Sequence, residues 1–268
     1  MDEGLFDESA VIRRVAGEGL ILAGAGRALL LQLAHPAVAR GVAAHSDFSD
    51  RFVDRLRATL TYVYAVLFGS REEAQAVSRT VRAVHTGVNG PGYDATDPAL
   101  QVWVNATLVD TGLLLYQAVF GPLPPGEVEQ CCRHYRVLAT AIGCPADAWP
   151  RTFADFSVYW HDMVGSLTVT ETARELATAL LWPRIPWPAR PVLPVARFLT
   201  VGLLPEPIRA GYGYSWTPRQ ARRLERGRRL TCAVYPRLPI RLRQAAKDHY
   251  LRDMRQRRSS GPGGAPFT

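Results

Sequence analysis

Cysteine and lysine are both scarce in this chain of 268 residues. Its four cysteines contain no Cys-x-x-Cys pair, and the adjacent Cys131 and Cys132 would point in different directions on a helix. These absences argue against a disulfide framework and against a zinc site. Lys247 is the only lysine among 32 basic residues, a bias that fits coding by a GC-rich genome, so we do not treat abundant arginine as evidence of function.

Long hydrophobic runs are also absent. The longest, Leu20 to Ala34, is shorter than the roughly 20 apolar residues that span a bilayer, and it is interrupted by Gly24, Arg27 and Gln32. We interpret it as a buried helix. The first residues are acidic where a secretory signal would be basic, so the sequence predicts a cytoplasmic protein.

Common catalytic motifs are missing too. The chain has no Gly-x-Ser-x-Gly elbow, Walker loop or His-Glu-x-x-His sequence, so hydrolase, nucleotidase and zinc-protease functions lack support. The glycines between Gly17 and Gly26 follow no predicted strand, which argues against a dinucleotide-binding fold. They would instead let helices, or a flat prosthetic group, approach the backbone closely.

Apolar residues make up 47% of the chain and charged residues 21%, which is typical of a folded globular protein. Most apolar positions recur three or four residues apart, which is the period of a helix. The sequence therefore predicts an all-α fold: a single globular domain of about ten helices over residues 1–258, followed by a disordered tail at 259–268.

Local signals predict where the helices begin and end. A first helix is expected from about Asp7 or Ser9 to Ala34, where His35-Pro36 ends it, because proline disfavours a helical residue before it. Capping residues are expected at 46–49, Ser70, Asp97 and Thr217. The other helices are expected at about 37–44, 49–69, 71–85, 98–120, 127–142, 152–181 with a candidate interruption at Gly165, 195–204, 218 onward and 240–255, with an extended proline-rich connector at 183–194.

The positive charge is concentrated towards the C-terminus. Residues 201–268 contain 15 Lys and Arg against 4 Asp and Glu, a net charge of +11, whereas residues 1–200 carry −3. Such a surface can simply face water, or it can meet an anionic membrane or an acidic partner. No aromatic residues are interleaved with the arginines at 222–229 as a stacking platform, so no nucleic-acid partner is expected, and peripheral contact with an anionic membrane stays open.

The six histidines show no i, i+4 pairing, so a two-histidine metal site on one helix is not expected. A single axial histidine is compatible with the pattern, although a lone histidine is more often a hydrogen-bonded structural residue.

Several segments occur in one order and together carry a family resemblance. They are LAHPAVARGVAAHSDF at 33–48, RLRATLTY at 55–62, VRAVHTGVNG at 81–90, WVNATLVD at 103–110, TFADF at 152–156 and GYSWTP at 213–218. The chain from about Ala16 to Pro218 resembles the catalytic domain shared by latex-clearing rubber oxygenases and the MpaB-type fungal oxygenase. No single segment is specific, but their combination is.

The resemblance implies an all-helical fold that encloses a pocket for haem b, with His85 as the proximal iron ligand. It also implies that Arg55 and Thr59, at i, i+4 on one helix face, donate to bound dioxygen or to the haem propionates. Arg57 and Arg82 are predicted as further cofactor-binding residues. Asn105 is predicted as a catalytic position.

The chain departs from the family pattern at two of these places. The distal Arg-x-x-Lys-Thr arrangement of rubber oxygenases matches residues 55–59, but Ala58 stands where that family has lysine. Asn105 stands where relatives of this size commonly have histidine, and an amide cannot exchange a proton near neutral pH. Control of the sixth coordination site and any proton transfer must therefore differ.

The leading functional hypothesis is a haem b-dependent oxygenase that uses dioxygen to attack an apolar substrate, with unsaturated molecules among the candidates. The alternative is a non-catalytic protein that binds haem or a hydrophobic ligand, which the residues at Ala58 and Asn105 motivate.

Overall fold

A computed structural model describes residues 4–45, 48–183 and 187–259. Within these ranges it contains fourteen α-helices, four short 3-10 helices and a single two-stranded hairpin. The predicted all-α class is confirmed. The number of helices exceeds the expected ten because several predicted helices are divided into shorter ones.

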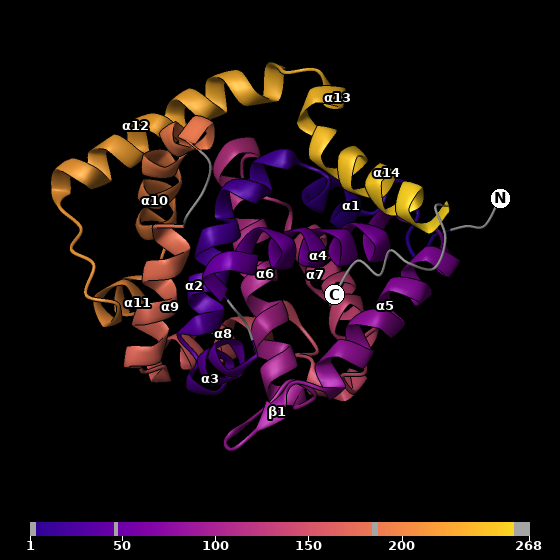
Figure 1. Cartoon of the computed structure of the whole chain (residues 1–268). Coiled ribbons are helices and arrows are strands. Elements are labelled where there is room, and N and C mark those ends of the chain that lie inside the picture. Colours follow the sequence, from indigo (N-terminus) through magenta and orange to yellow (C-terminus); the bar gives the residue numbers. More distant parts are fainter. Residues whose placement is uncertain (1–3, 46–47, 184–186, 260–268) are drawn as a thin grey trace.

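Helix α6 (Pro98–Phe120) lies at the centre of the molecule (Figure 1). It packs against η1 (Gly19–Gly24), α2 (Ala25–Leu33), α7 (Pro125–Thr140) and α12 (Pro218–Val234). Its sequence is apolar around most of its circumference, and a helix of this kind is stable when it is surrounded by others. Trp103 of α6 is fully buried and stacks on Trp160 of α8 (Phe153–Ser166).

A helical hairpin, α4 (Phe48–Phe68) and α5 (Arg71–Thr86), covers one side of this core. The predicted cap at Ser70 is confirmed as a capping box: its side chain accepts from the amide of Glu73, and the Glu73 carboxylate accepts from the amide of Ser70. The last helix, α14 (Ala245–Ser259), lies against this hairpin in Figure 1. The sequence Asn89-Gly90-Pro91-Gly92-Tyr93 predicts a turn after α5, and the structure confirms it as a hairpin of β1 (Asn89–Gly90) and β2 (Tyr93–Asp94).

The prediction of one long first helix that ends at Ala34 is wrong. It is divided into α1 (Val11–Ala16), η1 and α2, with the break at Gly17-Glu18. The Glu18 side chain is buried and forms an ion pair with Arg243 of α13 (Ile240–Arg243), 3.0 Å away. A buried carboxylate needs such a partner, and an unbroken amphipathic helix would not supply it.

The predicted stop at His35-Pro36 is confirmed. Pro36 begins α3 (Pro36–Ala44), and Nδ1 of His35 accepts a hydrogen bond from the amide of Ala37. No single helix of the described residues is long and apolar enough to cross a membrane; on length and composition alone, only the bent pair Gly19–Leu33 and Pro36–Ala44 passes, with 102° between its halves.

The candidate interruption at Gly165 in the helix predicted at 152–181 is confirmed: α8 ends at Ser166, and Thr170 caps the start of α9 (Glu171–Leu181). The C-terminal half differs from expectation in three other places. The connector predicted as extended forms η3 (Trp187–Val192) and leads into α10 (Leu193–Gly202), since the fixed φ of proline also suits a first helical turn. The last predicted helix is broken at Gln244 between α13 and α14, and α11 (Glu206–Gly211) was not predicted.

The predicted caps at Asp97 and Thr217 are confirmed, the latter as a capping box with Gln220. The expected capping residues at 46–47 lie outside the described residues, as does the tail from 260 onward. Ser259, which was assigned to the tail, ends α14.

Two glycines near the start of the core confirm the expected close approach of helices. A Cβ atom at Gly24 would overlap Thr111 and Leu115 of α6, and one at Gly26 would overlap Thr200 of α10. At these two positions η1 approaches α6, and α2 approaches α10, more closely than a side chain would permit.

We expect Gly26→Ala to lower the free energy of unfolding by about 1–3 kcal/mol, because the added methyl group overpacks a buried contact. Urea denaturation measures this, and the additional change Thr200→Ala should restore part of the loss. Gly227→Ala is the matched control, because nothing lies within 4 Å of its added methyl group. Equal stability of Gly26→Ala and wild type would contradict the close packing.

Candidate functional site

Five of the predicted site residues lie on the α4–α5 hairpin, and among them Arg55 lies close to His85. Arg55, Arg57 and Thr59 lie on α4, and Arg82 and His85 lie on the antiparallel α5. His85 continues the face of α5 that is buried at Val77 and Ser78 and partly buried at Val81, and its side chain is half-buried. Across the two helices these residues are 23 to 30 positions apart in the sequence, and the tight turn at Gly69-Ser70 brings the helices side by side.

The imidazole of His85 has an enclosed nitrogen with no partner. Its Nδ1 is buried and forms no hydrogen bond with any described residue. Burial lowers the pKa of His85, and the positive charge of Arg55 lowers it further. The ring is therefore neutral near pH 7, the form in which an imidazole nitrogen can bind a metal ion.

These properties fit a histidine ligand of haem iron. An enclosed nitrogen without a partner costs free energy, and coordination or a bound group that orients the ring would remove that cost. No group of three or more His, Cys, Asp or Glu side chains among the described residues could hold a metal ion by itself.

The other predicted residues have definite local roles. The Thr59 hydroxyl is exposed and donates to the carbonyl of Arg55 within its own helix, at 2.9 Å. The Arg57 guanidinium donates to Asp253 of α14 at 3.1 Å. Arg82 is exposed and packs beside Gly143, after α7. Of these three, Arg57 is already engaged with a carboxylate, so it could contact a haem propionate only by sharing that interaction.

The two departures from the family pattern lie in different surroundings. Ala58 is half-buried on α4 beside the predicted site, where its methyl group has no donor or acceptor. Asn105 is buried on α6 and donates to the carbonyl of Gln101 in the same helix, at 2.8 Å. Asn105 therefore belongs to a different helix from the predicted site residues of the α4–α5 hairpin.

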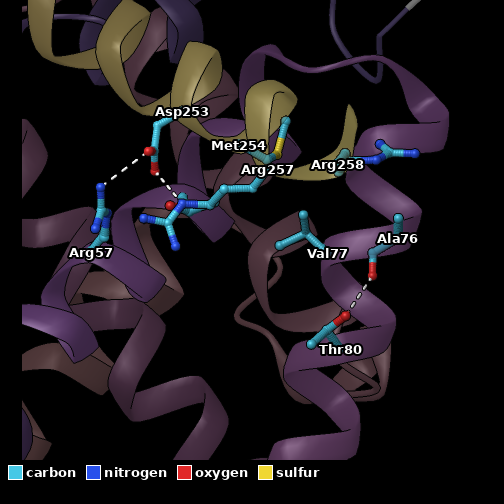
Figure 2. Close-up of a pocket in the computed structure, with 9 residues that line it drawn as sticks. Arg57, Ala76, Val77, Thr80, Asp253, Met254, Arg257 and Arg258 are labelled. Atoms are coloured by element: carbon cyan, nitrogen blue, oxygen red, sulfur yellow. Dashed lines mark hydrogen bonds and ion pairs between the residues drawn. The ribbon is translucent and has the colours of Figure 1, made fainter. Parts of the chain in front are cut away.

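A small cavity of about 120 Å³ lies between α4, α5 and α14 (Figure 2). Asp253 bridges Arg57 and Arg257 at one side of it, and Val77 and Met254 contribute apolar surface. Ligand pockets usually measure roughly 300–1,000 Å³, and His85 is not among the residues that line this cavity. It adjoins the predicted site along the same helices and does not by itself form the expected haem pocket.

The sequence interpretation missed a second polar cluster, centred on Arg27 of α2. The Arg27 side chain is only 4% exposed. It donates to Asp110 Oδ2 at 2.6 Å, to Thr111 Oγ1 at 2.5 Å and to the carbonyl of Leu203 at 2.7 Å. Its guanidinium also lies over the ring of Trp160. We refer to Arg27, Asp110 and Thr111 as the Arg27 cluster.

The Arg27 cluster is electrically balanced. Burial raises the pKa of Asp110, and the adjacent guanidinium counteracts this increase. A signal for the pair exists in the sequence, because Arg27 is the only charged residue of the run 20–34 and Asp110 is the only one of the segment 98–120. A buried charge requires a partner of opposite sign, and each of these two buried helices has a single charged residue. Arg27 and Asp110 could therefore have been paired from the sequence.

Comparison with known proteins adds a family relationship. The family model described as "ER-bound oxygenase mpaB/B'/Rubber oxygenase, catalytic domain" matches residues 12–234, which include α4, α5 and His85. Uncharacterized protein Mb2261 of Mycobacterium bovis and Uncharacterized protein Rv2237 of Mycobacterium tuberculosis are each 28% identical to the chain over 208 residues, covering 74% of this chain and 82% of theirs. No solved structure matches the chain.

Proposed function

The chain belongs to the family of ER-bound oxygenase mpaB/B' and rubber oxygenase catalytic domains, and from this premise we propose that it is a haem b-dependent oxygenase with His85 as the iron ligand. The proposed substrate is an apolar small molecule, with unsaturated compounds as the first candidates, and the oxidant is dioxygen. The observation that carries the proposal is the match of the family model to residues 12–234, which include His85, and the half-buried, neutral imidazole with its unpartnered Nδ1 is compatible with the role of ligand.

The residues around His85 support this role in distinct ways. When bound, haem supplies the iron at which dioxygen is activated. The low pKa of His85 keeps its ring unprotonated and available as a ligand. Arg55 places a positive charge close to the ring, where it can attract the haem carboxylates or a developing negative charge. Thr59 shares that helix face, but its hydroxyl donates to the carbonyl of Arg55, so it could donate to bound dioxygen or to a propionate only by leaving that hydrogen bond.

Two observations favour a second candidate, a non-catalytic protein that binds haem or another hydrophobic ligand. Ala58 offers no polar group beside the site, and Asn105, which lies on α6, uses its amide to donate to the carbonyl of Gln101 in its own helix. Neither position supplies a group that titrates near neutral pH. In this alternative the protein binds haem through His85 and catalyses no oxygen consumption.

The first test is the visible absorption spectrum of the purified protein, as isolated and after reconstitution with haemin. We expect an intense Soret band that shifts when the protein is reduced under carbon monoxide, because iron with a single protein ligand has a free position for the gas. Oxygen uptake in the presence of an apolar alkene then separates the two candidates: uptake with product formation supports the oxygenase, and binding without uptake supports the carrier. The absence of a Soret band after reconstitution would contradict both haem-based proposals.

A further inference from the structure

An unusually apolar part of the surface is formed where α12 ends and the chain turns through η4 (Tyr235–Arg237) into α13. Within the described residues, five of the eleven exposed large apolar side chains fall in the segment 230–242, which we call the apolar corner. The most exposed are Leu230 at 66% and Leu242 at 64%. The five side chains are Leu230, Val234, Leu238, Ile240 and Leu242.

The helix geometry separates an inner from an outer face in this segment. Cys232 donates to the carbonyl of Ala118 on α6, and the Tyr235 hydroxyl accepts from the amide of Leu20. These two contacts attach the segment to the protein body. Leu230 and Val234, four residues apart, share another face of α12 and remain exposed. In Figure 1 α12 runs along the outer edge of the molecule, and α13 lies where the chain turns back into α14.

The charges around the apolar corner have one sign. The segment 218–247 contains nine arginines and one lysine, and Glu225 is its only acidic residue. Glu225 pairs with Arg228 and Arg229, while Arg243 pairs with the buried Glu18. Within the described part of the chain, Arg226 and Arg241 form no ion pair. Arg226 lies one helical turn before Leu230, and Arg241 lies between Ile240 and Leu242, so uncompensated positive charge flanks the exposed apolar side chains.

We propose that the apolar corner docks on the surface of an anionic phospholipid bilayer. Leu230, Leu238 and Leu242 enter the interface between headgroups and acyl chains, and Arg226 and Arg241 contact the negative headgroups. Apolar side chains beside unpaired cations match this surface better than the alternatives do. A nucleic acid would leave the leucines without apolar partners, and a second copy packed around a two-fold axis would bring like charges together. The proposal does not depend on haem binding.

Flotation with lipid vesicles tests the proposal on the full-length protein. We expect the protein to float with vesicles that mix phosphatidylcholine and phosphatidylglycerol at low salt, and to float poorly with phosphatidylcholine alone or at high salt. The double variant Leu230→Ser/Leu242→Ser should lower the affinity for the mixed vesicles about tenfold or more, because two apolar contacts are lost. Arg226→Gln/Arg241→Gln should weaken binding and reduce its dependence on salt.

The matched controls are Val158→Ser on α8, where the side chain is 62% exposed, and Arg133→Gln, an exposed arginine on α7. Both should bind vesicles as the wild type does. All substituted side chains are exposed, so the variants should keep the helical circular dichroism spectrum and thermal midpoint of the wild type. The proposal would be overturned if the protein did not float with anionic vesicles, or if the leucine variant floated as the wild type does. It would also be overturned if the protein formed a dimer without vesicles and the same variants dissociated that dimer. Salt-sensitive binding to single-stranded DNA in place of vesicles would overturn it as well.

Discussion

Arg27→Ala is expected to lower the free energy of unfolding by about 3–5 kcal/mol, because it removes one partner of a buried ion pair and leaves the other behind. In the wild type the Arg27 guanidinium is almost fully buried and donates to Asp110, Thr111 and the carbonyl of Leu203. Without it, these acceptors keep their burial and lose their donor. Equilibrium unfolding in urea measures the change, and the far-UV circular dichroism spectrum shows whether the variant folds.

The size of this loss depends on Asp110 remaining charged in its buried position. We therefore expect the double variant Arg27→Met/Asp110→Leu to lose less unfolding free energy than the two single variants lose in sum. In the double variant no charge is left without a partner. Arg174→Ala is the control for an exposed pair: Arg174 and Glu171 are 44% and 76% exposed, so their separation should change the stability by less than about 1 kcal/mol. If Arg27→Ala lowered the free energy of unfolding by less than about 1 kcal/mol, the Arg27 cluster would not hold α2, α6 and α10 together.

Sequence signals within a few residues predicted the helix boundaries well. Ser70, Asp97 and Thr217 cap the helices that follow them, and Pro36 ends one helix and begins another. In each case the boundary is set by a hydrogen bond or a steric restriction between close neighbours in the chain. Such interactions are present in the sequence itself, without knowledge of the fold.

The boundaries that were missed depend on partners far away in the chain. The break at Gly17-Glu18 puts the Glu18 carboxylate beside Arg243, which is 225 residues away in the sequence. The same limit applies to the candidate site. The α4–α5 hairpin follows from the turn at Gly69-Ser70, so the closeness of Arg55 to His85 was predictable, whereas the pairing of Arg57 with Asp253 depends on how α14 packs against α4.

The assignment of His85 itself came from the resemblance of a whole set of segments, because no local property singles it out. His134 on α7 shows this directly. Its Nδ1 is also buried without a partner, and burial likewise lowers the pKa of His134. Its ring packs against Phe6, and it lies outside the segments that carry the resemblance. His134 is therefore a matched control for an imidazole with similar surroundings and no predicted role.

His85→Ala is expected to abolish the Soret band of the protein reconstituted with haemin, or to replace it with the spectrum of weakly held, non-coordinated haem, because the variant removes the proposed iron ligand. His85 is half-buried, so the variant should keep its fold and its circular dichroism spectrum. Free imidazole added to His85→Ala should restore the wild-type band by occupying the vacated space, and His134→Ala should bind haem as the wild type does. If His85→Ala and wild type gave the same spectrum while His134→Ala lost it, the ligand would be on α7; if all three gave the same spectrum, haem would be bound without either histidine.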